Sequence, residues 1–126
     1  MKKITQLSVL LTFLFTLFSS TSLLASEAEV PPTLNCPADL VISNDPGVCG
    51  AIVDYLSMAS AIDPEDGDIS MAIITTIGPT NNSLFPIGLT VVELSVTDSE
   101  GNTVTCSFSV TVNDTEPPTI NCPADM

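Results

Sequence analysis

The sequence predicts an all-β protein, folded as a sandwich of two antiparallel sheets with about seven short strands. In residues 102–112, every even position from 104 onward is apolar and every odd position from 103 onward is Ser or Thr. This period of two is typical of a strand with one buried face. No segment after residue 25 shows the 3.6-residue period of an amphipathic helix. The remaining stretch of about 100 residues is the size of one small domain.

The strands are expected in segments bounded by turn-forming residues. In chain order, the expected strands are 40–43, 51–56, 69–77, 84–85, 92–97 and 102–112. Asp, Asn, Gly and Pro, which turns favour, are concentrated between them at 45–47, 63–68, 78–82 and 98–102. The last two segments flank a short connector rich in turn residues, and they predict an antiparallel hairpin.

Residues 1–25 have the three-part organisation of a secretory signal peptide. Lys2 and Lys3 give a positive start, an apolar run follows at 7–18, and small residues surround Ala25. The apolar run is shorter than the roughly 20 residues of a membrane-spanning helix. We therefore expect a signal-peptide helix ahead of the sandwich, a secreted or cell-surface location, and membrane contact only through this segment. The short Lys-Lys start favours a bacterial source.

After the signal peptide the sequence contains no positively charged side chain. The two Lys residues are at positions 2 and 3, and all fifteen Asp and Glu residues lie between Glu27 and Asp125. Binding to nucleic acid is excluded, because phosphates are neutralised by Lys and Arg. Two interpretations stay open. The carboxylates bind metal ions or a cationic partner, or they only keep the protein soluble.

Acidic residues are densest in the segment 63–68. Calcium is coordinated by six to eight oxygens, which clustered carboxylates and loop carbonyls supply. Calcium is therefore the one cofactor we consider, with four candidate ligands: Asp63, Glu65, Asp66 and Asp68. The alternative is that Asp66 and Gly67 form a hairpin turn and the acids are solvated. Further acids lie in another turn and in the following linker, at Asp98, Glu100, Asp114 and Glu116.

The composition does not favour catalysis in this domain. Glycosidases use two positioned carboxylates, but a chain of this length is too short for both a core and a deep cleft. Ser and Thr are numerous, yet without His or Lys no conventional base activates them. We expect no catalytic and no cofactor-binding residue here. An enzyme elsewhere in a longer protein is compatible with the sequence.

A ten-residue phrase occurs twice in the sequence. Residues 31–40 read PPTLNCPADL and residues 117–126 read PPTINCPADM, an offset of 117 − 31 = 86 residues. Repetition at this spacing indicates an array of small domains. We expect one complete domain at 30–115 and the truncated start of a second copy at 116–126. The Pro-Pro pairs are expected to hold successive copies apart semi-rigidly.

The repeated phrase and four further motifs resemble one known family. The motifs are GVCGA at 47–51, LFPIG at 84–88, TDSEGN at 97–102 and TCSF at 105–108. In this order they resemble a hyalin repeat (HYR) domain. The resemblance implies an immunoglobulin-like sandwich that occurs in tandem arrays in secreted or surface proteins and is associated with cell adhesion. The family has no known active site to carry over.

Four cysteines allow three full connectivities, and the residues alone do not choose among them. Cys122 is the counterpart of Cys36 in the second copy. The resemblance implies a Cys36–Cys106 disulfide, since family members with two cysteines keep this pair. The rival pairing is Cys49–Cys106. Many bacterial members have a further Cys in the middle loop, at 62–68 here. That partner is missing, so Cys49 is expected to be free and buried.

The leading functional prediction is a non-catalytic structural or adhesion module of a secreted or cell-surface repeat protein, acting as a spacer or protein-interaction unit. Its partners would be neighbouring HYR repeats and an unidentified extracellular protein, matrix or glycan partner. Two alternatives remain: a calcium-dependent glycan- or protein-binding module, and an accessory domain of a larger exported enzyme. Only Tyr55 and Phe85 are candidates for stacking on a sugar, and both are expected in the core.

Overall fold

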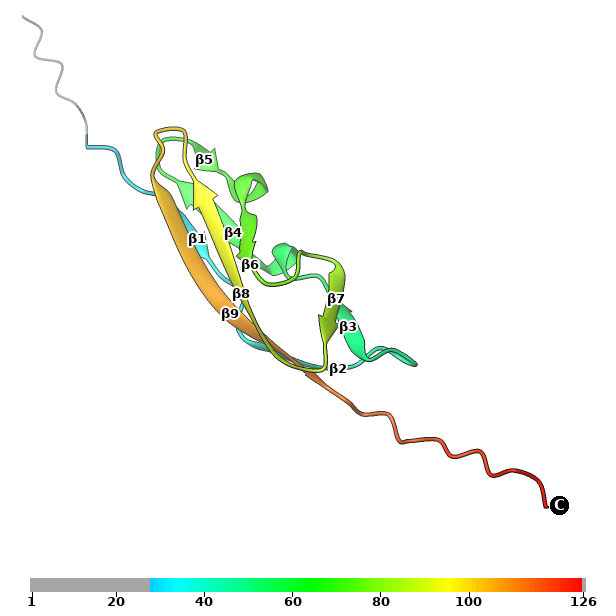
Figure 1. Cartoon of the computed structure of the whole chain (residues 1–126). Coiled ribbons are helices and arrows are strands. Elements are labelled where there is room, and N and C mark those ends of the chain that lie inside the picture. The colour runs from blue at the N-terminus through cyan, green and yellow to red at the C-terminus, as the bar shows by residue number, and fades with distance from the viewer. Residues whose placement is uncertain (1–27, 126) are drawn as a thin grey trace, which may run out of the picture.

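The computed structural model describes residues 28–125, so the predicted signal peptide lies outside the described residues. The described part is an all-β sandwich with two single-turn 3-10 helices (Figure 1). Its elements are β1 (Thr33–Asn35), β2 (Leu40–Ser43), β3 (Gly50–Val53), η2 (Leu56–Met58), β4 (Ser60–Asp63), β5 (Gly67–Asp68), η3 (Ser70–Ala72), β6 (Ile74–Ile77), β7 (Ser83–Pro86), β8 (Gly88–Thr97) and β9 (Thr103–Asn113). None of its helices has the length and apolarity needed to span a membrane.

The larger layer is a four-stranded sheet in the order β2-β9-β8-β6. The predicted hairpin is confirmed as β8 and β9, which pair antiparallel from Gly88 opposite Val112 to Thr97 opposite Thr103. At one edge, β6 pairs antiparallel with β8. At the other edge, β2 pairs parallel with β9, which differs from the all-antiparallel arrangement that the sequence predicts.

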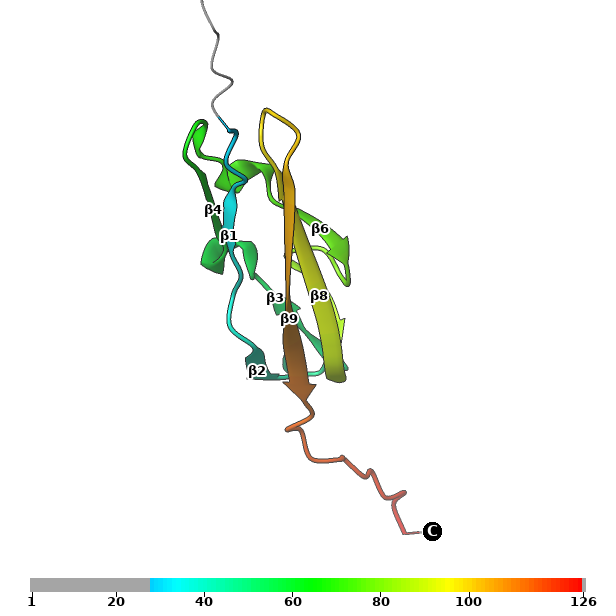
Figure 2. The same cartoon turned by 90° about the vertical axis from the view of Figure 1, so that its left-hand side faces the viewer.

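The second layer consists of the sheet β1-β4-β5 and the pair β3-β7, all antiparallel. Figure 2 shows β1 and β4 on one side of the molecule and β9, β8 and β6 on the other. Residues 36–39 carry the chain from β1 in this layer to β2 in the larger sheet. The buried Pro37 lies in this crossing, where its lack of an N–H group prevents a continuous ladder. This crossing is the reason that β2 runs parallel to β9.

The core lies between the layers and is built from the alternating residues of the strands. Val92, Leu94 and Val96 from β8 are almost fully buried against apolar side chains of β9. Tyr55 and Phe85 have 0% exposure, so the prediction that both lie in the core is confirmed. The Tyr55 ring packs edge-on against Phe85 and Phe108, with centroids 6.1 Å and 5.4 Å away.

Two predicted strands are shorter than expected, and local hydrogen bonds explain both differences. In the segment 69–77, Asp68 Oδ1 accepts bonds from the Ser70 amide and hydroxyl. These bonds favour the η3 turn over strand pairing at this point, so the strand begins only at Ile74, as β6. The segment 51–56 ends as a strand at Val53 because Asn81 Oδ1 accepts bonds from the amides of Tyr55 and Leu56. Strands β1, β4 and β5 were not predicted: β1 and β5 have only three and two residues, and β4 turns the apolar Ile62 outward and the acidic Asp63 inward, so its hydropathy does not reveal its buried face.

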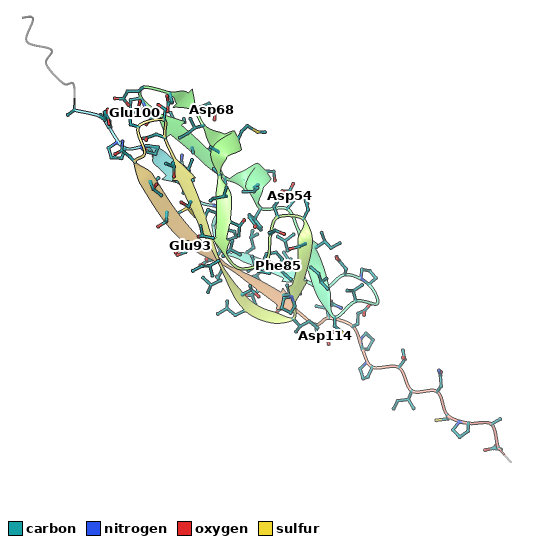
Figure 3. The ribbon with its side chains drawn as sticks, turned by 45° about the horizontal axis from the view of Figure 1, so that its top comes forward. Asp54, Asp68, Phe85, Glu93, Glu100 and Asp114 are labelled. Carbon is teal, nitrogen blue, oxygen red and sulfur yellow. A yellow bond between two sulfur atoms is a disulfide. The ribbon has the colours of Figure 1, made fainter. Side chains whose placement is uncertain are left out.

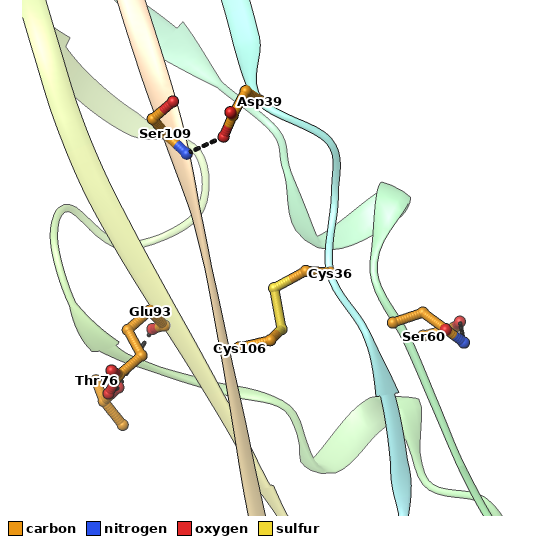
Figure 4. The surroundings of a disulfide bond; sticks show 8 residues. Cys36, Asp39, Ser60, Thr76, Glu93, Cys106 and Ser109 are labelled. Carbon is orange, nitrogen blue, oxygen red and sulfur yellow. Dashed lines mark hydrogen bonds between the residues drawn. A yellow bond between two sulfur atoms is a disulfide. The ribbon is translucent and has the colours of Figure 1, made fainter.

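A disulfide joins Cys36 to Cys106 across the two layers, with the Cα atoms 6.0 Å apart (Figure 4). Cys36 directly follows β1, and Cys106 lies in the middle of β9. This is the pairing that the family resemblance implies. Cys49 is free and exposed, so the rival pairing and the expected burial of Cys49 are both wrong. Cys49 is exposed because it lies in the turn before β3 rather than on a strand's inner face.

Removing this cross-link is expected to lower the stability of the sandwich strongly. The disulfide joins residues 70 positions apart, and the loop-entropy estimate for such a loop is roughly 4 kcal/mol. Urea unfolding of Cys36→Ser with Cys106→Ser should therefore show a free energy of unfolding lower by up to about this amount. Cys49→Ser is the matched control and should unfold like the unaltered chain. An equal loss in both proteins would contradict this account.

Candidate metal centre

Two turns meet at the pole where the chain enters the sandwich, here called the N-terminal pole (Figure 1). One is the β4–β5 turn at residues 64–66, and the other is the β8–β9 turn at 98–102. Asp66 in the first turn binds Ser99 in the second: Asp66 Oδ2 accepts from the Ser99 amide, and Asp66 Oδ1 accepts from the Ser99 hydroxyl, both at 2.8 Å. The two turns are therefore held together although they are 33 residues apart in the sequence.

Three carboxylates gather at this contact. One oxygen from each of Asp63, Asp66 and Glu100 lies within 4.8 Å of the other two. Of the four candidate ligands predicted from the sequence, the structure brings Asp63 and Asp66 together and leaves Glu65 and Asp68 outside the cluster. Glu100 was noticed as an acidic turn residue but not assigned to the site. Its approach depends on the pairing of distant strands, which no local pattern reveals.

Asp63 is the buried member of the cluster, with only 1% of its surface exposed. Its Oδ1 atom accepts bonds from the amides of Glu65 and Asp66, at 2.8 and 2.7 Å, and so shapes the β4–β5 turn. Gly67 closes this turn with a φ of +80°, a conformation that glycine adopts without strain. The second oxygen, Asp63 Oδ2, is buried and has no hydrogen-bond partner.

Asp68 has a local role instead of a place in the cluster. Its Oδ1 atom accepts from the Ser70 hydroxyl at 2.6 Å and from the Ser70 amide at 3.0 Å. These bonds lower the pKa of Asp68, because they stabilise the charged form. Figure 3 shows Asp68 and Glu100 at the same end of the molecule and Asp114 at the opposite end.

The β8–β9 turn is shaped by a second buried carboxylate, Asp98. Its Oδ1 accepts from the Asn102 amide at 2.7 Å, and its Oδ2 accepts from the Asn102 side-chain amide at 2.8 Å. Burial raises the pKa of Asp98, but the bonds from Asn102, Gly101 and Glu100 outweigh it, and the net pKa is lowered. Asp98 thereby holds Ser99 and Glu100 in position beside the β4–β5 turn.

A different arrangement of polar groups occurs at the opposite, C-terminal pole, where the chain leaves β9. Asn44 is 8% exposed, and its Oδ1 atom accepts from the Thr115 amide at 3.0 Å. The Gly47 amide donates to Glu116 Oε1 at 2.8 Å. These four residues are called the C-terminal clasp below. Asn44 was not singled out from the sequence, where it is one of several turn residues before Pro46.

The two-layer sandwich with one cross-layer disulfide is a disulfide-stabilised immunoglobulin-like module. The HYR domain family model matches residues 29–112, and the chain belongs to this family. Two hyalins are among its relatives. Hyalin of Lytechinus variegatus is 34% identical over 82% of this chain, and hyalin of Strongylocentrotus purpuratus is 30% identical over 86%.

The chain spans only a small part of these relatives, 19% and 9% of their lengths. It is also 31% identical, over 71% of its length, to the rat "Sushi, von Willebrand factor type A, EGF and pentraxin domain-containing protein 1", of which it spans 2%. Among solved structures, it is similar to that of CBM51-2 in complex with GlcNAc and INT domains from Clostridium perfringens ZmpB. That match has a TM-score of 0.52 and 30% identity, over 66% of this chain and 16% of the other.

The hydrogen-bonded carboxylates determine how the free energy of unfolding should depend on pH in the acid range. The pKa is lowered in four of them, namely Asp39, Asp54, Asp68 and Asp98. A carboxyl whose pKa is lower in the folded state stabilises the fold above the unfolded value of about 3.9, and this contribution is lost as the pH falls through the folded value.

We therefore expect the free energy of unfolding to fall as the pH drops below about 4. Asp98→Asn should destabilise the protein at neutral pH, because its new amide group would face that of Asn102, and should flatten the decline in acid. The comparison is by urea unfolding between pH 2 and 7. The control is Glu65→Gln, whose side chain makes no hydrogen bond in the structure; its free energy of unfolding should fall with pH as in the unaltered chain. A Glu65→Gln profile as flat as that of Asp98→Asn would refute the assignment of part of the pH dependence to Asp98.

Proposed function

We propose that this chain is a non-catalytic structural or adhesion module of a secreted or cell-surface repeat protein, acting as a spacer or protein-interaction unit. The observation that carries this proposal is the position of the two chain ends. The described chain enters at one pole of an elongated sandwich and leaves at the other (Figures 1 and 2). Copies joined in this way extend end to end, each adding its length to the array.

The repeated phrase supports an arrangement in tandem. Residues 117–126 repeat residues 31–40 with two conservative exchanges, so residues 116–126 would begin a second HYR module. Residues 114–125 form no strand in the structure. Neighbouring HYR repeats would thus be the nearest partners of this one.

The C-terminal clasp supports a semi-rigid connection between modules. Bonds from Thr115 to Asn44 and from Gly47 to Glu116 hold the linker against the loop that precedes β3. Pro117 and Pro118 follow at once and restrict the backbone further. A linker held in this way sets the direction in which the next module leaves.

Two features support the non-catalytic part of the proposal. Residues 28–125 contain no Lys, Arg or His, so no basic side chain is present to activate a nucleophile. Asp98 and the Oδ1 atom of Asp63 shape turns by accepting backbone amides. The four carboxyls with lowered pKa values are suited to hydrogen bonding in the charged form rather than to general acid catalysis.

The second candidate is a glycan- or protein-binding module whose binding depends on calcium. A structure with GlcNAc is among the similar ones, and the acidic cluster favours a role for a cation. However, the three aromatic residues of the described part are all buried: Tyr55, Phe85 and Phe108. Sugar sites commonly use exposed aromatic rings, so a protein partner is favoured over a glycan. An accessory role beside an exported enzyme and a bacterial source both stay predictions.

The orienting role of the clasp is tested by backbone 15N relaxation on the unaltered chain. The Thr115 amide should have an order parameter near that of β9, roughly 0.85, and Asn44→Ala should lower it below about 0.6. Glu116→Ala removes only the exposed bond to Gly47 and should loosen residue 116 without affecting the core. Asp68→Asn, at the other pole, is the control. A mobile Thr115 in the unaltered chain would argue against a semi-rigid spacer.

The choice between spacer and glycan binder is tested on a glycan array with the labelled chain, with and without calcium. We expect no specific signal, because no aromatic ring of the described residues is exposed. Saturable binding to one class of sugar in the presence of calcium would support the second candidate instead.

A further inference from the structure

We propose that Asp63, Asp66 and Glu100 bind one calcium ion, which fastens the β4–β5 turn to the β8–β9 turn at the N-terminal pole. The proposed ligand set differs from the one suggested by the sequence, since it excludes Glu65 and Asp68. The inference does not depend on the adhesive or spacer role: a module can bind calcium at its pole whether or not it holds any other partner.

The spacing of the carboxylates suits a single ion. Their oxygens lie within 4.8 Å of one another, and two ligands on opposite sides of a calcium ion, at about 2.4 Å each, are about as far apart. Calcium tolerates six to eight oxygens in irregular geometry, which three carboxylates, turn carbonyls and water together provide. Magnesium needs shorter bonds of about 2.0–2.1 Å and near-ideal octahedral geometry, so a site drawn from two separate turns favours calcium.

The unpaired oxygen of Asp63 points independently to a cation. Asp63 is 1% exposed, and its Oδ2 atom is buried with no hydrogen-bond partner. Leaving a buried charged oxygen unpaired is costly. Most proteins would pair it with Lys or Arg, but the chain has neither after Lys3. A metal ion supplies the missing positive charge.

Ser99 gives a second indication at the same place. Its hydroxyl lies 2.8 Å from Asp66 Oδ1 and 2.7 Å from Glu100 Oε1. A serine hydroxyl has one proton and can donate to only one of these oxygens at a time. The other carboxylate oxygen therefore lies beside the serine oxygen without a proton between them, and this surplus of acceptors is relieved by a cation.

The location suggests what the ion would do. Thr33, the first residue of β1, pairs with Ile62 in the antiparallel pair β1–β4, so Asp63 lies close to the point where the chain enters the sandwich after Pro32. Pro32 is itself buried. Joining the two turns with calcium would stiffen the pole where the chain enters, as the clasp holds the pole where it leaves.

The test is a calcium titration of the purified chain, followed by calorimetry and by melting temperature. We expect one site with a dissociation constant on the order of 0.1–1 mM, as in other extracellular modules, and a rise in melting temperature of about 5 °C at 5 mM calcium. Magnesium at the same concentration should give a clearly smaller rise.

The variants separate a specific site from general screening of a highly acidic protein. Glu100→Gln, on an exposed residue, should weaken binding by about tenfold or more while leaving the melting temperature in chelator unchanged. Asp63→Asn should weaken binding by a similar factor. It should also lower the melting temperature in chelator, because it alters a buried group. Glu65→Gln and Asp68→Asn remove the same charge from the same loop and should bind within about twofold of the unaltered chain.

Two results would overturn the proposal. One is no heat and no melting shift at 5 mM calcium, and the other is an equal response of all four variants and of magnesium. Either result leaves the spacer role untouched, because that role is measured separately at the C-terminal clasp.

Discussion

The Cys36–Cys106 disulfide joins the two layers covalently, and the stability of the fold depends on it more than it would in a domain with internal ion pairs. Residues 28–125 have no positively charged side chain, so no ion pair within them can hold the layers together. Their many carboxylates repel one another and cost the compact state stability. The apolar core is small, as in any domain of about 100 residues. The disulfide offsets both weaknesses by restricting the unfolded chain.

The carboxylates contribute to the fold as hydrogen-bond acceptors, which is the role left to them when no cation is available. Asp39 Oδ1 accepts from the Ser109 amide at 2.7 Å and so fixes the crossing segment to β9 (Figure 4). Asp98 and Asp63 each shape a turn by accepting backbone amides. Bonds to charged acceptors are stronger than neutral ones. An acidic composition is therefore compatible with precise turns as well as with solubility.

The two poles of the sandwich are built differently, and the difference bears on how modules follow one another. At the C-terminal pole, Asn44 and Gly47 hold the departing linker with direct hydrogen bonds. At the N-terminal pole, Asp63 and Glu100 belong to a cluster with more acceptors than donors. The C-terminal pole has its acceptors paired within the chain, whereas the N-terminal pole would be completed by the proposed calcium ion. In a tandem array of such modules, the stiffness of the joints would then depend partly on the calcium concentration.

Local sequence determined the features that depend on local period and turn chemistry. The alternation of β8 and β9 revealed their hairpin, the core positions of Tyr55 and Phe85 were predicted, and the repeated phrase indicated the module's length. Tertiary structure alone decided the parallel pairing of β2 with β9 and the meeting of Asp66 with Ser99, because both join residues far apart in the chain. A metal site in the acidic loop could be proposed from its composition, but Glu100 approaches Asp63 and Asp66 only in the folded structure.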